Sequence, residues 1–268
     1  MKKAVSHREK YLEDIRKNKI KVRVVQVSVV VAFILLWEWL TRAEYIDPFI
    51  FSSPSRIVKM TVTMAQSDLC YHILITVAET LAGFGIGVIM GLFIAVAMWF
   101  CPFAGKVAAP FLVVLHSLPK IALGPVIIVW AGAGAGAIIV MAVAISLVVT
   151  VLELSGGFDA TDKNLITTVQ SFGATKTQVF LKVVLPCNVP VLFQSLKVNI
   201  GLSLVGVIAG EFLVSKAGLG YLIVYAGQVF KMDLVMMSVV ILGIVAFAMY
   251  QLVSVARRIV ENKINHNT

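Results

Sequence analysis

Long runs of apolar residues without charge restrict the folds that this sequence can adopt. Residues 234–256, for example, contain no charged side chain. A helix needs about 20 apolar residues to cross the roughly 30 Å hydrocarbon core of a bilayer. Of the 268 residues, 59% are hydrophobic and only 14% are charged, whereas soluble domains carry about 25% charged residues. We therefore expect an integral membrane protein.

The hydropathy pattern predicts an all-α fold with about six transmembrane helices. The expected spans are residues 24–40, 73–100, 107–130, 136–152, 187–209 and 234–256. The third is interrupted by Lys120 and by three prolines, which disturb a regular helix. Residues 24–258 would form one membrane domain, between a basic N-terminal tail at 1–23 and a C-terminal tail at 259–268.

The distribution of Lys and Arg predicts how these spans are oriented. Nine of the 23 basic residues precede the first span, three lie in segment 162–186 and three follow the sixth span. Because cytoplasmic loops carry an excess of Lys and Arg, both termini and segment 162–186 are expected in the cytoplasm. The net charge of +9 then reflects topology and contact with anionic lipid. No nucleic-acid-binding motif accompanies it, and no nucleic-acid partner is expected.

Segment 162–186 is the most patterned polar stretch, with the sequence DKNLITTVQSFGATKTQVFLKVVLP. Its first half has apolar residues at helical spacing, namely Leu165, Val169 and Phe172. Gly173 is expected to end this helix, because glycine readily adopts a positive φ. Thr175 and Gln178 have the spacing of a capping box that begins a second short helix. The pattern indicates a helix–glycine–helix unit with an apolar face that docks into a partner.

Glycine positions elsewhere predict close packing and a bend. A stripe of small residues in the second span comprises Gly83, Gly87 and Gly91. Such a stripe lets helix backbones approach closely in lipid.

The apolar segment 210–233 predicts a re-entrant or surface-lying helix on the external side, with a bend at Gly218 and Gly220.

Ionisable side chains inside the spans are candidates for a solute pathway, because burying them in lipid costs a few kcal/mol each. Lys120 lies within the third span, with His116 one turn before it, and would attract an anionic solute. The alternative is that Lys120 reaches the interface or pairs with Glu79 or Glu211. Glu79 in the second span and Glu211 at the end of the fifth are candidates for the pathway or a gate, and equally for structural pairs.

Several classes of protein are disfavoured by missing motifs. The phosphate-binding pattern GxxxxGK[ST] is absent, so this chain is not expected to hydrolyse ATP by that route. The three cysteines lack metal-site or disulfide spacing. An intramembrane enzyme is disfavoured because HExxH and GxSxG are absent. A secondary transporter without an ATPase is the other alternative, but the two halves lack the inverted repeat typical of that class.

Segment 162–186 resembles the cytoplasmic loop motif, called the EAA motif, of permease subunits of binding-protein-dependent ABC importers. After Gly173 and nine further residues come Val183, Val184, Leu185 and Pro186, which is the spacing of that motif. The positions of Glu-Ala-Ala in the family are occupied here by Thr167, Thr168 and Val169. The stretches SSPSRIV, HSLPKIALGPVIIVWAGAG and AGEFLVSKAGLGYLI resemble the nitrate/sulfonate/taurine branch, and the resemblance covers roughly residues 25–258.

The resemblance implies a permease subunit of a bacterial inner membrane, not an enzyme. It implies pairing with a second copy as a homodimer, with two cytoplasmic ABC ATPases that bind ATP and Mg, and with an extracytoplasmic solute-binding protein. This chain itself is expected to bind no cofactor. The residues expected to couple to the ATPase are Thr167, Thr168, Val169, Gly173, Ala174, Phe180, Leu185 and Pro186. The solute would be a small organic or inorganic anion, such as a sulfonate, taurine or nitrate, or a vitamin precursor.

Overall fold

A computed structural model describes residues 7–266 of the chain. All regular structure in this range is helical, which confirms the predicted all-α fold class. In this range the longest helices are α1 (His7–Arg42), α4 (Leu69–Phe100), α5 (Pro102–Ser117), α7 (Ala135–Asp159), α11 (Val189–Val214) and α13 (Met232–His266). The shorter elements are α2 (Pro48–Phe51), α3 (Pro54–Ala65), η1 (Lys120–Leu123), α6 (Gly124–Ala131), α8 (Lys163–Ser171), α9 (Lys176–Val179), the π-helical η2 (Phe180–Val184), α10 (Leu185–Cys187) and α12 (Leu219–Gln228). Residues 1–6 and 267–268 of the expected tails lie outside the described residues.

The described range contains five single helices that are long and apolar enough to cross a membrane. They are Ile15–Arg42, Leu69–Phe100, Ala135–Asp159, Val189–Val214 and Met232–Val260. A sixth candidate is a pair of pieces, Pro102–Ser117 and Lys120–Ala131, bent by 85°. The expected third span, 107–130, is therefore broken between Ser117 and Lys120, next to Pro119. Leu118 adopts extended angles at the break, because a residue that precedes a proline avoids the helical region.

Three helices extend furthest beyond the expected spans. α1 begins at His7 inside the basic tail, α7 continues past residue 152 to Asp159, and α13 continues past residue 256 to His266. Charged residues end an apolar run without ending a helix, so these helices extend beyond the apolar runs on which the spans were predicted. In α7 the extension brings Glu153 into a membrane-spanning helix.

The centre of the bundle is α7, which packs between α4 and α11. A Cβ atom built on Gly83 would lie 2.5 Å from Ala142 Cβ, and one built on Gly206 would lie 2.6 Å from Ala142 Cα. Gly87 and Gly91 also face side chains of α7 within 3 Å of an added Cβ. The predicted glycine stripe of α4 is thus confirmed as a close helix contact, and a second set of glycines on α11 closes the other face of α7.

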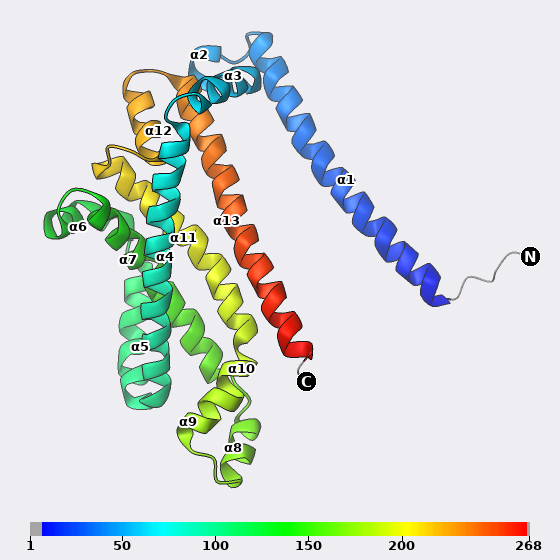
Figure 1. Ribbon diagram of the computed structural model, residues 1–268, viewed down its shortest axis with the longest axis vertical. Helices are drawn as coiled ribbons and strands as arrows, with labels where there is room; N and C mark the ends of the chain where they lie inside the picture. Colours follow the sequence, from blue (N-terminus) through cyan, green and yellow to red (C-terminus); the bar gives the residue numbers. More distant parts are fainter. Residues whose placement is uncertain (1–6, 267–268) are drawn as a thin grey trace, which may run out of the picture.

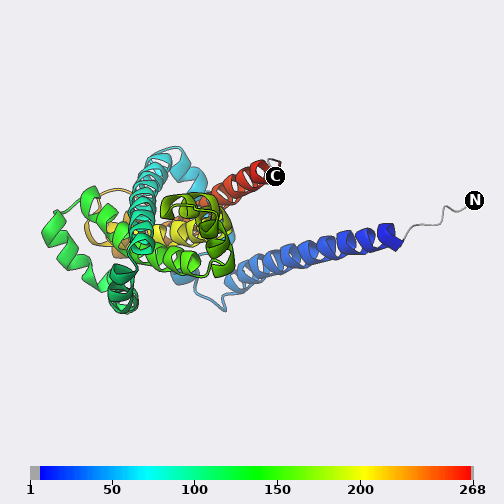
Figure 2. The ribbon, with the colours of Figure 1, turned by 90° about the horizontal axis from the view of Figure 1, so that it is seen from below.

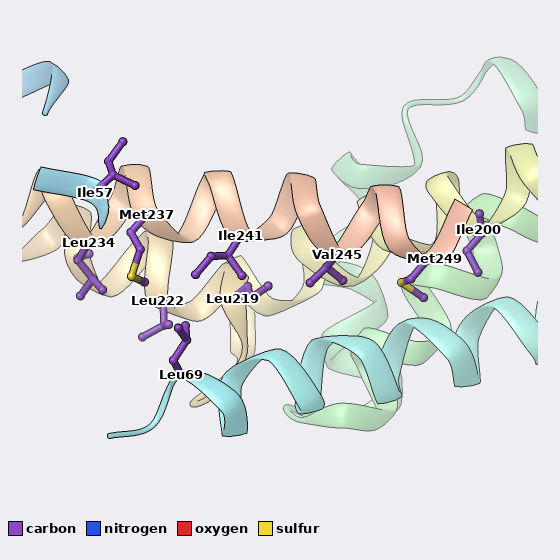
Figure 3. Packing of buried hydrophobic residues seen from close by; sticks show 11 residues of the cluster. Ile57, Leu69, Ile200, Leu219, Leu222, Leu234, Met237, Ile241, Val245 and Met249 are labelled. Atoms are coloured by element: carbon purple, nitrogen blue, oxygen red, sulfur yellow. The ribbon is translucent and has the colours of Figure 1, made fainter. Parts of the chain in front are cut away.

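A second apolar core joins α12 and α13 to α3 and to the start of α4. Leu219, Leu222 and Ala226 of α12 are buried against Met237 and its neighbours on α13, as Figure 3 shows along the length of α13. α12 therefore packs inward after a bend at Gly218, whose φ is +113°. Of the two expected arrangements, re-entrant or lying on the surface, the packing of one apolar face of α12 against the bundle favours the first.

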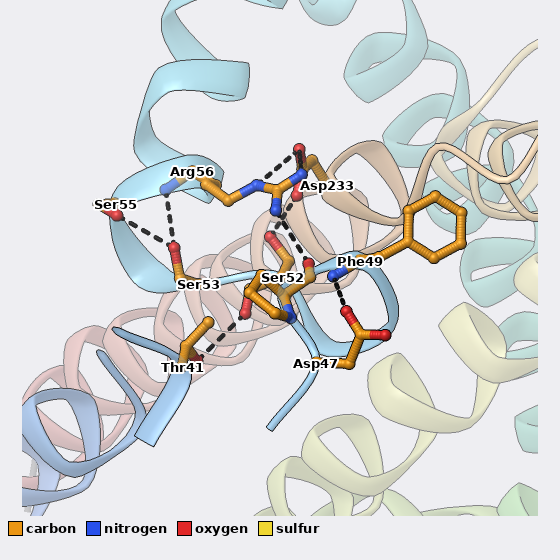
Figure 4. Close-up of polar contacts among 9 residues, drawn as sticks. Thr41, Asp47, Phe49, Ser52, Ser53, Ser55, Arg56 and Asp233 are labelled. Atoms are coloured by element: carbon orange, nitrogen blue, oxygen red, sulfur yellow. Dashed lines mark hydrogen bonds and ion pairs between the residues drawn. The ribbon is translucent and has the colours of Figure 1, made fainter. Parts of the chain in front are cut away.

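A polar cluster fixes the short helices α2 and α3 to the start of α13 (Figure 4). Arg56 donates two hydrogen bonds to Asp233 Oδ2, from Nε over 3.1 Å and from Nη2 over 2.8 Å. Ser52 Oγ donates to the other carboxylate oxygen over 2.7 Å. Asp233 lies in the first turn of α13, where a negative charge is favoured by the helix dipole.

Helix α1 stands apart from the bundle in both ribbon views (Figures 1 and 2). It contacts α2 and α3 near its C-terminal end. Apolar side chains such as Val24, Val30 and Leu35 are exposed along its length. α2, α3 and α12 lie at one end of the bundle, and α8 and α9 lie at the opposite end (Figure 1).

Candidate coupling site and intramembrane cavity

The helix–glycine–helix unit predicted at 162–186 is present as α8 and α9. Asp162 Oδ1 accepts a hydrogen bond from the Asn164 amide over 2.8 Å and caps α8. Gly173 follows α8 with a φ of +83°. Thr175 and Gln178 form the predicted capping box at the start of α9. Local sequence rules therefore account for both helices of this unit.

An aromatic cluster anchors the unit to the ends of α4 and α7. The ring centroid of Phe180 lies 5.0 Å from that of Trp99, 5.5 Å from that of Phe100 and 5.4 Å from that of Phe158. Val179 and Val184 are buried in the same cluster. Rings in such tilted and edge-on contacts contribute beyond their burial, by about 0.5–1.5 kcal/mol per pair. The unit is thus held rigidly against two membrane helices.

Polar contacts reinforce this attachment. Lys176 Nζ donates a hydrogen bond to the Phe100 carbonyl oxygen over 2.6 Å and lies over the Trp99 ring. Asn188 Nδ2 donates to Thr161 Oγ1 and to the Val184 carbonyl oxygen, each over 2.8 Å. Asn188 thereby connects the end of α7, the π-helical turn η2 and the start of α11.

The placement of Phe180 corrects one sequence-based prediction. Phe180 was expected to contact the ATPase, but its side chain is 5% exposed and faces the cluster described above. Phe172, the residue that follows α8, is instead 87% exposed. Leu165, seven residues earlier and therefore on the same side of the helix, is 49% exposed. Helical spacing identified Leu165 and Phe172 as sharing a face, but it carried no signal for which face the chain itself would cover.

The remaining predicted coupling residues divide between the exposed and the packed side of the unit. Thr167 and Thr168 are exposed. Their hydroxyls donate hydrogen bonds to carbonyl oxygens four residues earlier in the chain, so they are engaged within the unit itself. The residues that pack against the aromatic cluster are Val169, Ala174 and Leu185. Pro186 is exposed in the first turn of α10.

His116 and Lys120 lie together, as predicted, on the wall of a cavity of about 470 Å³. Lys120 Nζ donates a hydrogen bond to the His116 carbonyl oxygen over 3.1 Å. The opposite walls come from α7 and α11, and they include Glu153. Glu153 was not among the residues predicted for the pathway, because the expected fourth span stopped at residue 152. An acidic residue next to an uncharged run of 17 or more residues was the available signal.

Glu79 and Glu211 lie in a separate buried cluster. Glu211 is 1% exposed and accepts hydrogen bonds from Thr76 Oγ1 over 2.7 Å and from the Gly220 amide over 2.5 Å. Thr76 Oγ1 in turn accepts from the Leu219 amide over 2.8 Å. Glu79 is buried beside Glu211.

The Glu211 cluster satisfies the first amides of α12. His72 Nδ1 adds a contact by accepting from the Gly218 amide over 2.9 Å. Backbone N–H groups at a helix start have no partner within the helix, and acceptors from α4 and α11 supply the partners here. Within residues 7–266 no ion pair joins Lys120 to Glu79 or Glu211, which was one alternative from the sequence. Lys120 instead contacts His116 and lines the same cavity as Glu153.

Comparison with known proteins agrees with this architecture. The chain is 23% identical to the taurine transport system permease protein TauC of Escherichia coli (strain K12) over 84% of this chain and 85% of the relative. It is 26% identical to the formylaminopyrimidine transport permease protein ThiX of Halalkalibacterium halodurans over 70% of this chain and 74% of the relative. A structure of the inward-facing MetNI methionine ABC transporter has the same fold, with a TM-score of 0.65 at 20% identity over 72% of this chain and 95% of that chain.

The family match covers most of the membrane bundle. Residues 83–266 match the family described as binding-protein-dependent transport system inner membrane component. This range includes α5 to α13 and most of α4, and therefore both the α8–α9 unit and the cavity around Lys120. The chain is a multi-pass membrane protein and belongs to the family of binding-protein-dependent transport system inner membrane components.

Proposed function

We propose that this chain forms the solute pathway of an ATP-driven importer and receives movement from a separate cytoplasmic ABC ATPase through α8 and α9. The observation that carries the proposal is the arrangement around Phe172. Its ring is 87% exposed on a unit whose other face is fixed to α4 and α7. Leu165, seven residues earlier and therefore on the same side of α8, is also exposed, and an exposed apolar patch outside the membrane-spanning helices marks a docking surface.

In this proposal the ATPase contacts the exposed face of α8, formed by Leu165, Thr167, Thr168 and Phe172. Gly173 sets the angle between α8 and α9, since its φ of +83° suits glycine better than residues with a side chain. Val169, Ala174, Leu185 and Pro186 would transmit the movement through packing and backbone geometry. ATP binding would close the ATPase pair, and the unit would move as a rigid piece together with the ends of α4 and α7.

The proposed partners follow from the same role. Two ATPase copies would bind ATP and Mg, a second permease copy would complete the pathway, and an extracytoplasmic binding protein would deliver the solute. α8, α9 and both termini would lie in the cytoplasm of a bacterial cell. The proposed solute is a small anion such as a sulfonate, taurine or nitrate, or a vitamin precursor, and the names of the taurine and formylaminopyrimidine relatives support this range.

Co-purification of the tagged chain with an ATPase, in mild detergent, tests this proposal. We expect an ATPase to copurify with the wild-type chain and with Phe49→Ser, a control at the opposite end of the bundle where the phenylalanine is also exposed. Phe172→Ser should reduce the recovered ATPase at least tenfold while membrane insertion is unchanged. Recovery of equal ATPase with Phe172→Ser would assign the contact elsewhere. A stable chain without any ATPase would favour a secondary transporter.

A further inference from the structure

A buried carboxylate oxygen in the last third of α7 lacks a partner. Glu153 Oε2 is buried and accepts no hydrogen bond within residues 7–266. Glu153 belongs to α7, inside the candidate span Ala135–Asp159. A buried polar atom without a partner costs about 1–3 kcal/mol, and more when it is charged. Such a group in a native fold calls for a function or for a partner that is supplied from outside the chain.

The cavity beside Glu153 has the composition of a small-molecule site. Its volume is about 470 Å³, within the range of roughly 300–1,000 Å³ that ligand pockets occupy. Apolar residues from α7 and α11 form most of its wall, namely Ile145, Val149, Leu152, Val198 and Leu202. Three side chains with polar groups complete the wall: His116, Lys120 and Glu153. Apolar walls with a few polar groups are typical of pockets that orient one ligand.

The two opposite charges of this cavity are not joined to each other. No ion pair links Lys120 to Glu153 within the described part of the chain, although both line the same space. The single hydrogen bond recorded for Lys120 Nζ goes to the His116 carbonyl oxygen. An ammonium group has three donors, so two donors of Lys120 are available to a molecule in the cavity.

Glu153 also lines a second cavity toward the α8–α9 end of the bundle. That cavity has a volume of about 420 Å³ and includes Gln194 and Ser195 of α11 and Arg257 of α13. Glu153 therefore stands between the cavity of Lys120 and the end of the bundle that we assign to the cytoplasm. A solute that leaves the first cavity toward that end passes the carboxylate.

We propose that Lys120, with His116, and Glu153 form a solute subsite for a small zwitterion, a molecule that carries an anionic acid group and a protonated amine. Lys120 binds the acid group and Glu153 binds the amine, which gives its carboxylate the missing partner. A simple anion leaves Glu153 unpaired and is repelled by it, so the subsite discriminates against molecules without the amine. The inference rests on the proposed transport function and narrows the solute class within it.

Protection of an engineered cysteine tests the subsite without any need for the binding protein or for ATP. Cys70, Cys101 and Cys187 are first replaced by serine, and Val149→Cys then places a thiol on the cavity wall. The full-length chain, with its ATPase where one copurifies, is reacted with a methanethiosulfonate reagent in proteoliposomes. The probes are taurine, β-alanine, ethanesulfonate and ethylamine, which share a two-carbon chain and differ only in the charged groups they carry.

We expect taurine and β-alanine to protect the thiol at concentrations at least tenfold lower than ethanesulfonate or ethylamine. Glu153→Gln should reduce this preference to about twofold or less, whereas Glu38→Gln, an acid on α1 outside the cavity, should leave it unchanged. Lys120→Met should weaken protection by both zwitterions. If Val149→Cys fails to insert, Val198→Cys on the α11 wall takes its place.

Other outcomes would overturn the inference. Equal protection by ethanesulfonate and taurine would make the subsite a plain anion site, and protection by none of the probes would remove it. A zwitterionic lipid headgroup has the same chemistry, so the assay is repeated in liposomes with and without phosphatidylethanolamine. Protection by that lipid and not by taurine assigns the cavity to lipid. Because the assay needs no ATPase, its failure differs from a failure of the co-purification experiment.

Discussion

Lys176 Nζ donates a hydrogen bond to the carbonyl oxygen of Phe100, the last residue of α4, over 2.6 Å. The final carbonyl groups of a helix lack partners within it, and a cation near that end is favoured by the helix dipole, by about 0.3–1 kcal/mol at an exposed site. This contact places a charged side chain of α9 directly on the end of a membrane helix, so in the proposed mechanism a displacement of α9 would be passed on to α4.

Lys176→Met should therefore weaken coupling more than it weakens the fold. We expect a loss of stability of up to about 1 kcal/mol, together with a several-fold lower ratio of transported solute to hydrolysed ATP in proteoliposomes. Lys182→Met is the matched control, because it removes the same charge from an exposed position of η2. Equal ratios for both variants would show that the charge, and not the contact with Phe100, matters.

Two glycines of α11 should respond in opposite ways to the same substitution. A Cβ atom on Gly206 would lie 2.6 Å from the Ala142 backbone, whereas one on Gly201 would meet nothing within 4 Å. Overpacking costs about 1–3 kcal/mol, so Gly206→Ala should lower the melting temperature in detergent. Gly201→Ala should be neutral or stabilise by up to about 1 kcal/mol, because alanine favours helix. Equal melting temperatures would mean that α7 and α11 separate easily.

The hydroxyl of Thr76 should be needed for the start of α12. It donates to Glu211 and accepts from the Leu219 amide, so Thr76→Val leaves the buried Leu219 amide without this acceptor and removes one of the donors to Glu211 at nearly constant volume. We expect a loss of about 1–3 kcal/mol and faster hydrogen exchange at the first amides of α12. Thr76→Ser keeps the hydroxyl and should retain slow exchange. Fast exchange in both variants would point to the lost methyl group instead.

The Arg56–Asp233 ion pair should contribute little and should depend on salt. Arg56 is 44% exposed in this pair, and pairs at the surface contribute about 0.2–1 kcal/mol. A double-mutant cycle with Arg56→Met and Asp233→Asn should give a coupling energy in that range at low salt. In 1 M salt, where the screening length is about 3 Å, the coupling should fall toward zero. A coupling that persists would indicate that the cluster excludes solvent.

Local rules in the sequence were sufficient for the membrane class, the helical fold and the α8–α9 unit. The capping box at Thr175 and the positive φ at Gly173 depend on a few neighbouring residues, and both are present. The break at Pro119 was marked by the prolines, but its angle of 85° depends on packing that no local rule describes.

Long-range contacts explain what the sequence did not indicate. Phe172 and Phe180 both fall on apolar faces, and only the position of Trp99 and Phe158 decides that Phe180 is the buried one. The sequence around Gly206 does not indicate that this position needs a glycine, because the need arises from Ala142 on another helix. Glu153 lies just beyond the predicted end of its span, and it lines the same cavity as Lys120, which follows the break between α5 and α6.

The glycine contacts on both faces of α7 also determine how far a small movement is amplified. Because α4 and α11 lie so close to α7 that an added Cβ on their glycines would clash with it, the three helices would tilt together in the mechanism proposed above, starting from the aromatic cluster at Phe180. α7 has 25 residues, which corresponds to a length of about 37 Å at 1.5 Å per residue. A tilt of about 5° at the α8–α9 end therefore shifts the far end by about 3 Å over that length, roughly the width of a water molecule.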